Sequence, residues 1–213
     1  GERGSFALPT YYQQIDDLQD LIPICPSIPG CAPPPTSDPN CVFTAAGNIG
    51  EGERWGAVLD ATFALDGVGV KGGILKLTAD GRDSKVTDPI TGEERRINND
   101  LSYRWNVEFR QDLPDLKLAW GGDYTEVGDS EAFRLNEAQR RTAGAGDLDL
   151  FIETTAFKGI TVRLAADNIG DQPSYLDRRF FSPNRLPGGV FSRSEFREGT
   201  IGPIYAILVS GAF

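Results

Sequence analysis

The sequence predicts an all-β protein whose strands form a transmembrane antiparallel β-barrel. Apolar and polar residues alternate with a period of two over stretches of nine to eleven residues, which is the pattern of strands with one apolar face. The connections are of two kinds, as in outer-membrane barrels. Tight turns occur at 66–69, 113–115 and 156–159, and long polar segments, expected as extracellular loops, at about 21–50, 86–100 and 169–193.

Eight strands are expected in order along residues 1–213, which we treat as one segment. The first strand, around residues 6–14, is interrupted by Pro9, because proline cannot donate a hydrogen bond to a neighbouring strand. The other seven are expected at 54–65, 75–80, 103–110, 116–125, 147–155, 160–167 and 204–213. Aromatic residues lie near the ends of several apolar faces, where they suit the two interfaces of a membrane.

The last strand closes the sequence on an aromatic residue. Tyr205, Ile207 and Val209 share one face with Phe213. A barrel in lipid needs a final strand that pairs with an earlier one, since an open edge leaves backbone groups without partners. The segment is therefore predicted to close a barrel.

The composition excludes several other classes of protein. The chain has no His, which removes Ser-His-Asp and Cys-His catalysis and most zinc sites. We therefore expect no enzyme, no metal site and no cofactor. A net charge of −10 argues against nucleic acid as a partner. The chain also has no Met, which predicts a processed product or a fragment, and its first residues do not form a signal peptide.

Three cysteines lie close together in the first long polar segment. Clustering in a proline-rich loop favours one disulfide formed in an oxidising compartment, together with one unpaired cysteine. The spacing alone does not choose between the pairings of Cys25, Cys31 and Cys41.

Several segments resemble the late barrel strands of TonB-dependent outer-membrane receptors. These are Gly47–Thr62, Phe109–Gly121, Leu150–Thr155, Val162–Asp171, which contains Ala-Asp-Asn-Ile-Gly-Asp, and the terminal Ile207–Phe213. The resemblance implies the eight C-terminal strands of a 22-stranded barrel in the outer membrane of a Gram-negative bacterium. It also implies partners. These are the plug and earlier strands of the same receptor on a second chain, TonB acting through that plug, lipid or lipopolysaccharide, and a small nutrient, by default a ferric siderophore. The resemblance further implies that Phe213 forms part of the signal read by the barrel-assembly machinery.

Two groups of residues are candidates for function. Charges of both signs on the polar faces are expected to line a wet interior and to contact the plug; they are Arg104, Glu108, Arg110, Glu153, Arg163 and Asp167. Aromatic and cationic residues in the last long segment suit an anionic or aromatic ligand; they are Tyr175, Arg178, Arg179, Phe180, Phe181 and Arg185. Solvated walls and ordinary loop surface remain the alternative interpretations.

Two other classes of protein fit the same strand pattern. An independent eight-stranded barrel, acting as an adhesin or structural membrane protein, would close on itself. A secreted carbohydrate-binding sandwich would instead pack its apolar faces together in a dry interior. The sandwich differs from both barrels in what covers the apolar residues, and the two barrels differ in whether the eight strands close on themselves.

Overall fold

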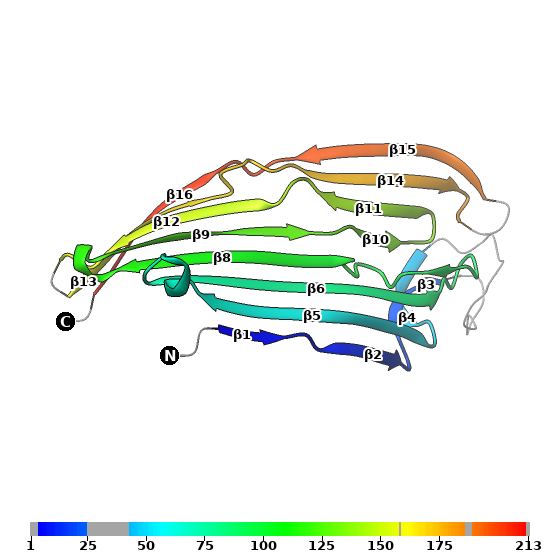
Figure 1. Cartoon of the computed structure of the whole chain (residues 1–213). Helices are drawn as coiled ribbons and strands as arrows, with labels where there is room; N and C mark the ends of the chain where they lie inside the picture. The colour runs from blue at the N-terminus through cyan, green and yellow to red at the C-terminus, as the bar shows by residue number, and fades with distance from the viewer. Residues whose placement is uncertain (1–3, 25–42, 158, 186–188, 212–213) are drawn as a thin grey trace.

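The computed structural model of the chain describes residues 4–24, 43–157, 159–185 and 189–211, and strands predominate in it (Figure 1). One long antiparallel sheet, here called the wall, contains most of the strands. Its members are β1 (Gly4–Ala7), β2 (Thr10–Ile15), β5 (Gly52–Ala64), β6 (Gly73–Thr87), β7 (Glu94–Arg95), β8 (Tyr103–Leu113), β9 (Leu118–Val127), β12 (Asp147–Thr154), β13 (Ile160–Asp167) and β16 (Ile204–Gly211). The expected all-β, antiparallel class is confirmed.

The wall strands follow one another in an up-and-down order. The path runs β1-β5-β6-β8-β9-β12-β13-β16, with β2 also paired to β5 and β7 to β6. β1 and β2 are therefore two halves of one strand, and the break between them includes Pro9 as expected. The pairing of β5 with β6 is continuous from Gly52 opposite Val86 to Ala64 opposite Ile74.

The two ends of the wall differ, as the turn lengths predict. At one end, called the turn end, strands are joined by the 3-10 helices η1 (Asp66–Val68) and η2 (Pro114–Leu116) and by a short turn after β12 (Figure 1). Gly69 and Lys117 adopt left-handed conformations with φ of 92° and 54° and end these two helices. For Gly69 this backbone conformation costs little, because glycine has no Cβ.

The opposite end, called the loop end, carries further strands. They are the pair β3 (Gln19–Ile24) and β4 (Phe43–Asn48), and a four-stranded sheet of β10 (Ser130–Phe133), β11 (Glu137–Ala143), β14 (Ser174–Ser182) and β15 (Val190–Gly199). β10 and β11 lie between two predicted strands, whereas β3, β4, β14 and β15 lie in or overlap segments expected to be loops. β7 also lies in one of these segments and pairs with the end of β6. Backbone pairing thus continues past the apolar part of the wall, since a strand in water needs no apolar face.

The wall has two chemically different faces. Neighbouring strands place Phe63, Leu75, Phe109, Gly122, Leu150, Ala166 and Tyr205 side by side in one row, and this side is called the apolar face. One residue along each strand, the row Thr62, Lys76, Glu108, Asp123 and Asp149 lies on the other side, called the charged face. The alternation follows from the two-residue period of a strand.

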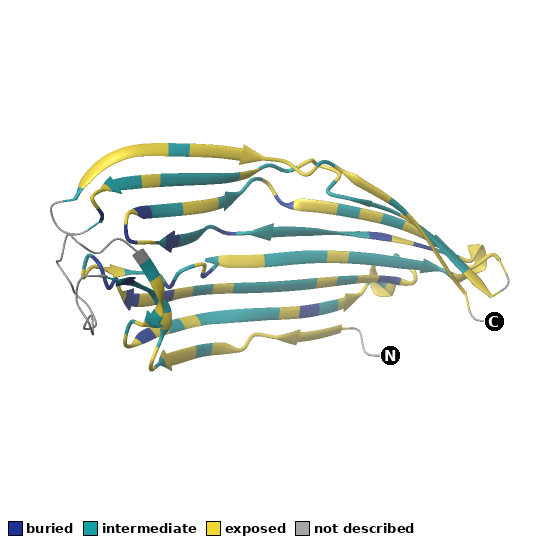
Figure 2. Cartoon of the chain, turned by 180° about the vertical axis from the view of Figure 1, so that it is seen from behind, coloured by how far each residue is buried: buried dark blue, intermediate teal, exposed yellow. Residues whose placement is uncertain are grey.

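No second layer covers the apolar face among the described residues. Trp120, Ile152 and Leu164 have 44%, 46% and 48% of their surface exposed, and Ile207 has 73% exposed (Figure 2). Most of the buried apolar residues in the described part of the chain lie at the loop end, namely Val86, Ile90, Ile97, Ala132 and Leu135, while Ala61 and Ala119 lie elsewhere in the wall. The dry interior of a sandwich is therefore absent from the described part of the chain, and the apolar face is free to meet lipid.

The sheet is open at both edges. In the part of the chain that the structure describes, β1 and β2 pair only with β5, and β16 pairs only with β13. These strands therefore do not form the closed eight-stranded barrel of the alternative interpretation. Neither 3-10 helix, nor any other helix within the described ranges, is long and apolar enough to span a bilayer.

Candidate functional site at the loop end

Strand register decides which loop-end side chains lie on the charged face. Val86 alternates with Ser84 and Arg82 on that face, and Arg95 lies directly opposite Val86. The Arg95 guanidinium lies 5.0 Å from the centre of the Phe133 ring, so Phe133 is on the charged side of β10. Phe133 of β10 lies opposite Ala138 of β11, and Ala138 lies opposite Arg179 of β14. Ala138 and Arg179 are therefore on the charged face as well.

The six residues expected to meet a ligand separate into three groups. Tyr175, Arg179 and Phe181 lie on the charged face of β14, because they alternate along one strand. Arg178 and Phe180 lie on the opposite side. There the Arg178 guanidinium binds the Glu137 carboxylate at 2.7 and 3.0 Å and the Glu195 carboxylate at 3.1 Å. The sixth residue, Arg185, belongs to a buried ion-pair network.

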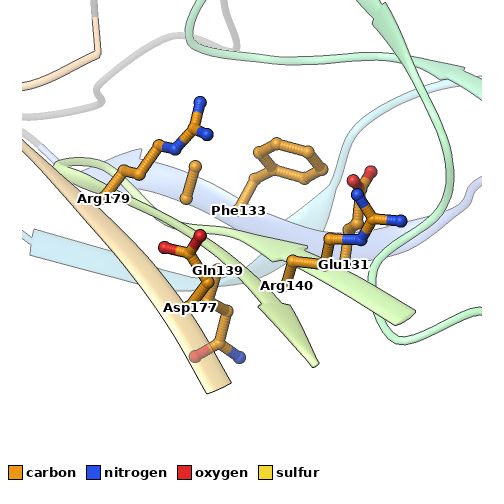
Figure 3. Close-up of a pocket in the computed structure, with 7 residues that line it drawn as sticks. Glu131, Phe133, Gln139, Arg140, Asp177 and Arg179 are labelled. Atoms are coloured by element: carbon orange, nitrogen blue, oxygen red, sulfur yellow. The ribbon is translucent and has the colours of Figure 1, made fainter. Parts of the chain in front are cut away.

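A cavity of about 250 Å³ lies on the charged face between β10, β11 and β14. Its lining is Glu131, Phe133, Ala138, Gln139, Arg140, Asp177 and Arg179. Figure 3 shows the Phe133 ring with Arg179 on one side and Arg140 and Glu131 on the other, while Gln139 points away from them. The cavity therefore combines one aromatic face with charges of both signs.

The two arginines of this cavity differ in whether they form an ion pair. Arg140 binds the Asp129 carboxylate, and this hydrogen bond, together with the charges of Glu131 and Asp177, raises the pKa of the Arg140 guanidinium. Among the described residues, no carboxylate lies within ion-pair distance of the Arg179 guanidinium. Arg179 is therefore the cation of this cavity that remains available to an anion.

A shallow groove of about 580 Å³ adjoins the cavity through Arg179 and Asp177. The rest of its lining is Phe181, Phe191, Ser194 and Phe196. The Phe181 and Phe191 rings meet edge to face at 6.3 Å between centres, and Tyr175 stacks on Phe196 at 5.7 Å. Aromatic faces beside an unpaired guanidinium provide stacking for a planar ligand and a partner for its negative charge.

Next to the cavity, Asp88 is the centre of a buried network of charges. Its carboxylate, in a residue that is 1% exposed, accepts hydrogen bonds from Arg95 Nε at 2.6 Å and Arg185 Nη2 at 2.8 Å. It also accepts from the backbone N–H groups of Ile90 and Thr91 at 2.8 and 3.0 Å. Burial raises the pKa of this carboxyl, but the Arg185 charge and these hydrogen bonds outweigh it and lower the pKa.

The network joins segments that are far apart in the sequence. Arg95 Nη2 also binds the Asp20 carboxylate at 3.1 Å, and Asp20 accepts from Asn98 Nδ2 at 2.6 Å. The amide of Asn98 in turn binds the backbone N–H and C=O of Phe133 at 2.8 and 3.2 Å. Both Arg95 and Arg185 lie over the Phe133 ring, 5.0 and 5.1 Å from its centre. We call Asp20, Asp88, Arg95, Asn98, Phe133 and Arg185 the loop clamp.

The loop clamp is expected to loosen in acid. A carboxyl whose pKa is lowered by folding stabilises the folded state above its unfolded value, about 3.9, and this stabilisation disappears as pH falls through the folded pKa. For Asp88 the loss should therefore occur below about pH 4. Hydrogen exchange of residues 88–98 in the complete receptor, corrected for intrinsic rates, should show faster opening at pH 3 than at pH 7. The variant Asp88→Asn should lose this dependence. Equal opening at both pH values in the unaltered receptor would contradict the expectation.

The residues expected to face a wet interior all lie on the charged face, but only three of them meet. Glu153 lies between Arg110 and Arg163, with N–O distances of 3.4 and 3.9 Å. The same two guanidiniums flank the Phe151 ring at 5.6 and 3.8 Å from its centre. Arg104, Glu108 and Asp167 lie on the same face. Within the described ranges, these three form no ion pair of 4.0 Å or less.

Some predicted positions lie outside the described residues. Cys25, Cys31, Cys41 and Phe213 are among them, so their pairing and contacts stay predictions. Within residues 4–24, 43–157, 159–185 and 189–211, no three His, Cys, Asp or Glu side chains gather as a metal site would require.

The comparisons with known proteins identify the family. A family model described as the β-barrel of TonB-dependent receptor-like proteins matches residues 1–169. No curated protein and no solved structure matches the chain. The match covers most of the chain and includes the strands of the wall up to β13. The chain therefore belongs to the family of TonB-dependent receptor β-barrels, as its resemblance predicts.

Proposed function

We propose that this chain is the C-terminal wall of a transporter that takes up a scarce extracellular nutrient with energy supplied through TonB. Receptors of this family are outer-membrane proteins of Gram-negative bacteria. The observation that carries the proposal is an open sheet of this family with one apolar and one charged face. Such a sheet separates lipid from a hydrated interior. A transport role also agrees with a family of transporters rather than enzymes.

The open edges support a larger barrel, which we propose has 22 strands. In lipid, each backbone group left without a partner costs several kcal/mol. The outer edges of β1, β2 and β16 therefore need strands from the rest of the receptor. The N-terminal plug of that receptor would connect it to TonB. We further propose that Phe213 helps the barrel-assembly machinery to recognise β16.

The charged face supports contacts with the plug. Glu153 already shares its two oxygens between Arg110 and Arg163, so this group tolerates a change of partner when a plug moves. Arg104, Glu108 and Asp167 have no ion pair among the described residues and are the groups most open to plug partners. Exposed ion pairs on such a surface are weak, about 0–1 kcal/mol each, which suits contacts that break during transport.

The groove beside Arg179 supports a ligand that is both aromatic and anionic. Tyr175, Phe181 and Arg179 face the same side, toward the interior of the barrel. Arg178 and Phe180 face the opposite side, and Arg185 is held in the loop clamp. We therefore propose Tyr175, Arg179 and Phe181 as contacts for the nutrient. A ferric siderophore with catecholate groups has this chemistry and is the default.

Uptake of radiolabelled iron as a ferric catecholate tests the function. Cells that contain the complete receptor should accumulate the label, and cells that also lack TonB should bind it at the surface without accumulation. Cobalamin and an oligosaccharide serve as the other probes, because the family match does not choose the nutrient. TonB-independent accumulation of all three would contradict the proposal.

The variant Arg179→Ser tests the ligand contact separately from transport. Losing one charge-assisted pair should weaken binding of the ferric catecholate by about tenfold, with maximal uptake preserved at saturating ligand. Lys85→Ser is the matched control, because Lys85 is also an exposed loop-end cation but lies beside Glu94, away from the groove. Equal affinities in all three receptors would remove Arg179 from the site.

A further inference from the structure

Two strand pairings meet out of step at the junction between the wall and the loop end (Figure 1). The pairing of β14 with β15 ends toward the wall with Ser174 opposite Gly199. The pairing of β13 with β16 ends toward the junction with Asp167 opposite Ile204. Between these two points there are six residues from β13 to β14 but only four from β15 to β16. The β13–β16 register is therefore shifted by two residues from a direct continuation of the β14–β15 register.

A turn at residues 168–171 takes up the two extra residues. The backbone N–H of Asp171 donates to the C=O of Asn168 at 3.0 Å, and the N–H of Gln172 donates to Asn168 Oδ1 at 3.0 Å. Asn168 and Asp171 have φ of 52° and 45°, a left-handed conformation that Asn and Asp adopt more readily than most residues. The N–H of Asn168 also donates to Asp149 Oδ1 at 2.8 Å. The turn is therefore held by its own hydrogen bonds and by β12.

Two side chains of this turn bind both backbone groups of Gly202, just before β16 begins. Asn168 Nδ2 donates to the C=O of Gly202 at 3.1 Å, and the N–H of Gly202 donates to Asp171 Oδ1 at 3.0 Å. Gly202 has φ of 81°, which costs glycine little, and it lies two residues before Ile204, the first residue of β16. These two hydrogen bonds fix Gly202 along β13, and with it the residue at which the β13–β16 pairing starts.

The sequence of β16 does not determine this register by itself. Residues 204–211 contain no charged side chain, and apolar residues lie on both faces, with Ile207 on the apolar face and Leu208 on the charged face. β12 differs, because a shift by one residue would place Asp149 in lipid. A shift of β16 by two residues leaves every side chain on its own face, so the hydrophobic pattern does not oppose it. That shift is also the one that would make the two pairings continuous.

We propose that the 168–171 turn is a registration site, which binds Gly202 so that the outer edge of β16 meets the rest of the receptor in the right alignment. Without these hydrogen bonds β16 shifts by two residues, about 7 Å, and Ala165 then lies opposite Leu208 instead of Ala206. Every backbone group on the outer edge of β16 moves by the same distance, which misaligns the partners that a strand in lipid requires. The inference rests on the larger barrel of the proposed function but not on the nutrient or on TonB.

Pairs of introduced cysteines report the register in the complete receptor. Ala165→Cys/Ala206→Cys should form a disulfide, whereas Ala165→Cys/Leu208→Cys should not, because only the first pair lies opposite in the structure. Adding Asn168→Gly/Asp171→Gly should lower the ratio of the first disulfide to the second by about tenfold or more, since two hydrogen bonds are lost. Glycine is chosen because it adopts the positive φ of both positions without strain. Mass spectrometry of the linked peptides measures the two yields.

Gln172→Gly is the matched control for this experiment. It also places a glycine beside the turn, but the side chain of Gln172 donates to the C=O of Gly170 at 3.4 Å rather than to Gly202. Its disulfide ratio should equal that of the receptor with the unaltered turn. An unchanged ratio in Asn168→Gly/Asp171→Gly, or an equal fall in the control, would overturn the proposal.

A rescue experiment covers the case in which Asn168→Gly/Asp171→Gly assembles poorly. The disulfide of Ala165→Cys/Ala206→Cys locks the register of the structure, so it should restore most of the heat-modifiable receptor. The disulfide of Ala165→Cys/Leu208→Cys locks the shifted register and should not. No rescue by the first pair, or equal rescue by both, would mean that the turn does not act through register and would overturn the proposal. Transport can fail in the uptake experiment while these results hold, since none of them measures uptake.

Discussion

A complete receptor carrying Ile207→Arg is expected to reach the outer membrane in a small fraction of the normal amount. Ile207 lies on the apolar face of the edge strand β16 and has 73% of its surface exposed. An arginine on the lipid side of a barrel costs about 2–4 kcal/mol at the centre of the bilayer and less toward the interfaces. Heat-modifiable receptor in outer-membrane fractions measures the folded amount.

The neighbouring residue supplies a strict control for this experiment. Leu208 is also a branched apolar residue of β16, with 51% of its surface exposed, but it lies on the charged face opposite Arg163. In Leu208→Arg the new guanidinium lies in water opposite one like charge, that of Arg163, and this repulsion costs at most about 1 kcal/mol. The two variants differ only in the face that receives the arginine. Similar losses for both would show that the apolar face of β16 does not meet lipid.

The wall strands other than β7 were predictable, with β1 and β2 as one strand, and so were their faces, because the same physical rule determines both. Leu148, Leu150 and Ile152 alternate with Asp147, Asp149 and Phe151, and the structure places these sets on opposite faces of β12. A strand between lipid and water must alternate in this way, so the period of two indicates its faces. The tight turns were predictable for a similar reason, since Gly69 adopts a positive φ in a short connection.

Strands beyond the membrane were harder to recognise. β14 contains Tyr175, Asp177, Arg179 and Phe181 on one face, but Arg178 on the other face also carries a charge. Water surrounds both faces at the loop end, so no rule requires one of them to be apolar. The period of two is then hidden, and the segment resembles a polar loop.

For the candidate site, the sequence predicts which types of residue are present but not how they are arranged in space. The sequence identifies the aromatic and cationic residues around 175–185, but the separation of Arg178 from Arg179 requires the register of β14 with β11. The loop clamp depends on contacts between residues far apart in the chain, such as Arg95 with Asp20 and Arg185 with Asp88. One local signal was present, because an Asp two residues before a backbone N–H often forms an Asx turn, as Asp88 does with Ile90.

Removing the charge of Asp88 is expected to open the loop end. In Asp88→Asn, the guanidiniums of Arg95 and Arg185 stay buried, and Asp20 is the one carboxylate of the clamp left to them. Breaking a buried ion pair by removing one partner costs about 3–5 kcal/mol. Hydrogen exchange should therefore show a loss of this size in the local opening free energy of residues 88–98. The exchange of β12 and β13 should not change, because the clamp contacts neither strand.

An exposed pair in the same segment gives the comparison. Glu94 binds Lys85, and their side chains are 65% and 48% exposed, so Glu94→Gln should cost no more than about 1 kcal/mol. The contrast between the two substitutions isolates burial, since each removes one carboxylate charge from the connection between β6 and β8. If Asp88→Asn changes local exchange no more than Glu94→Gln does, the loop clamp does not hold the loops together. The groove beside Arg179 would then lack the fixed Phe133 wall on which its shape depends.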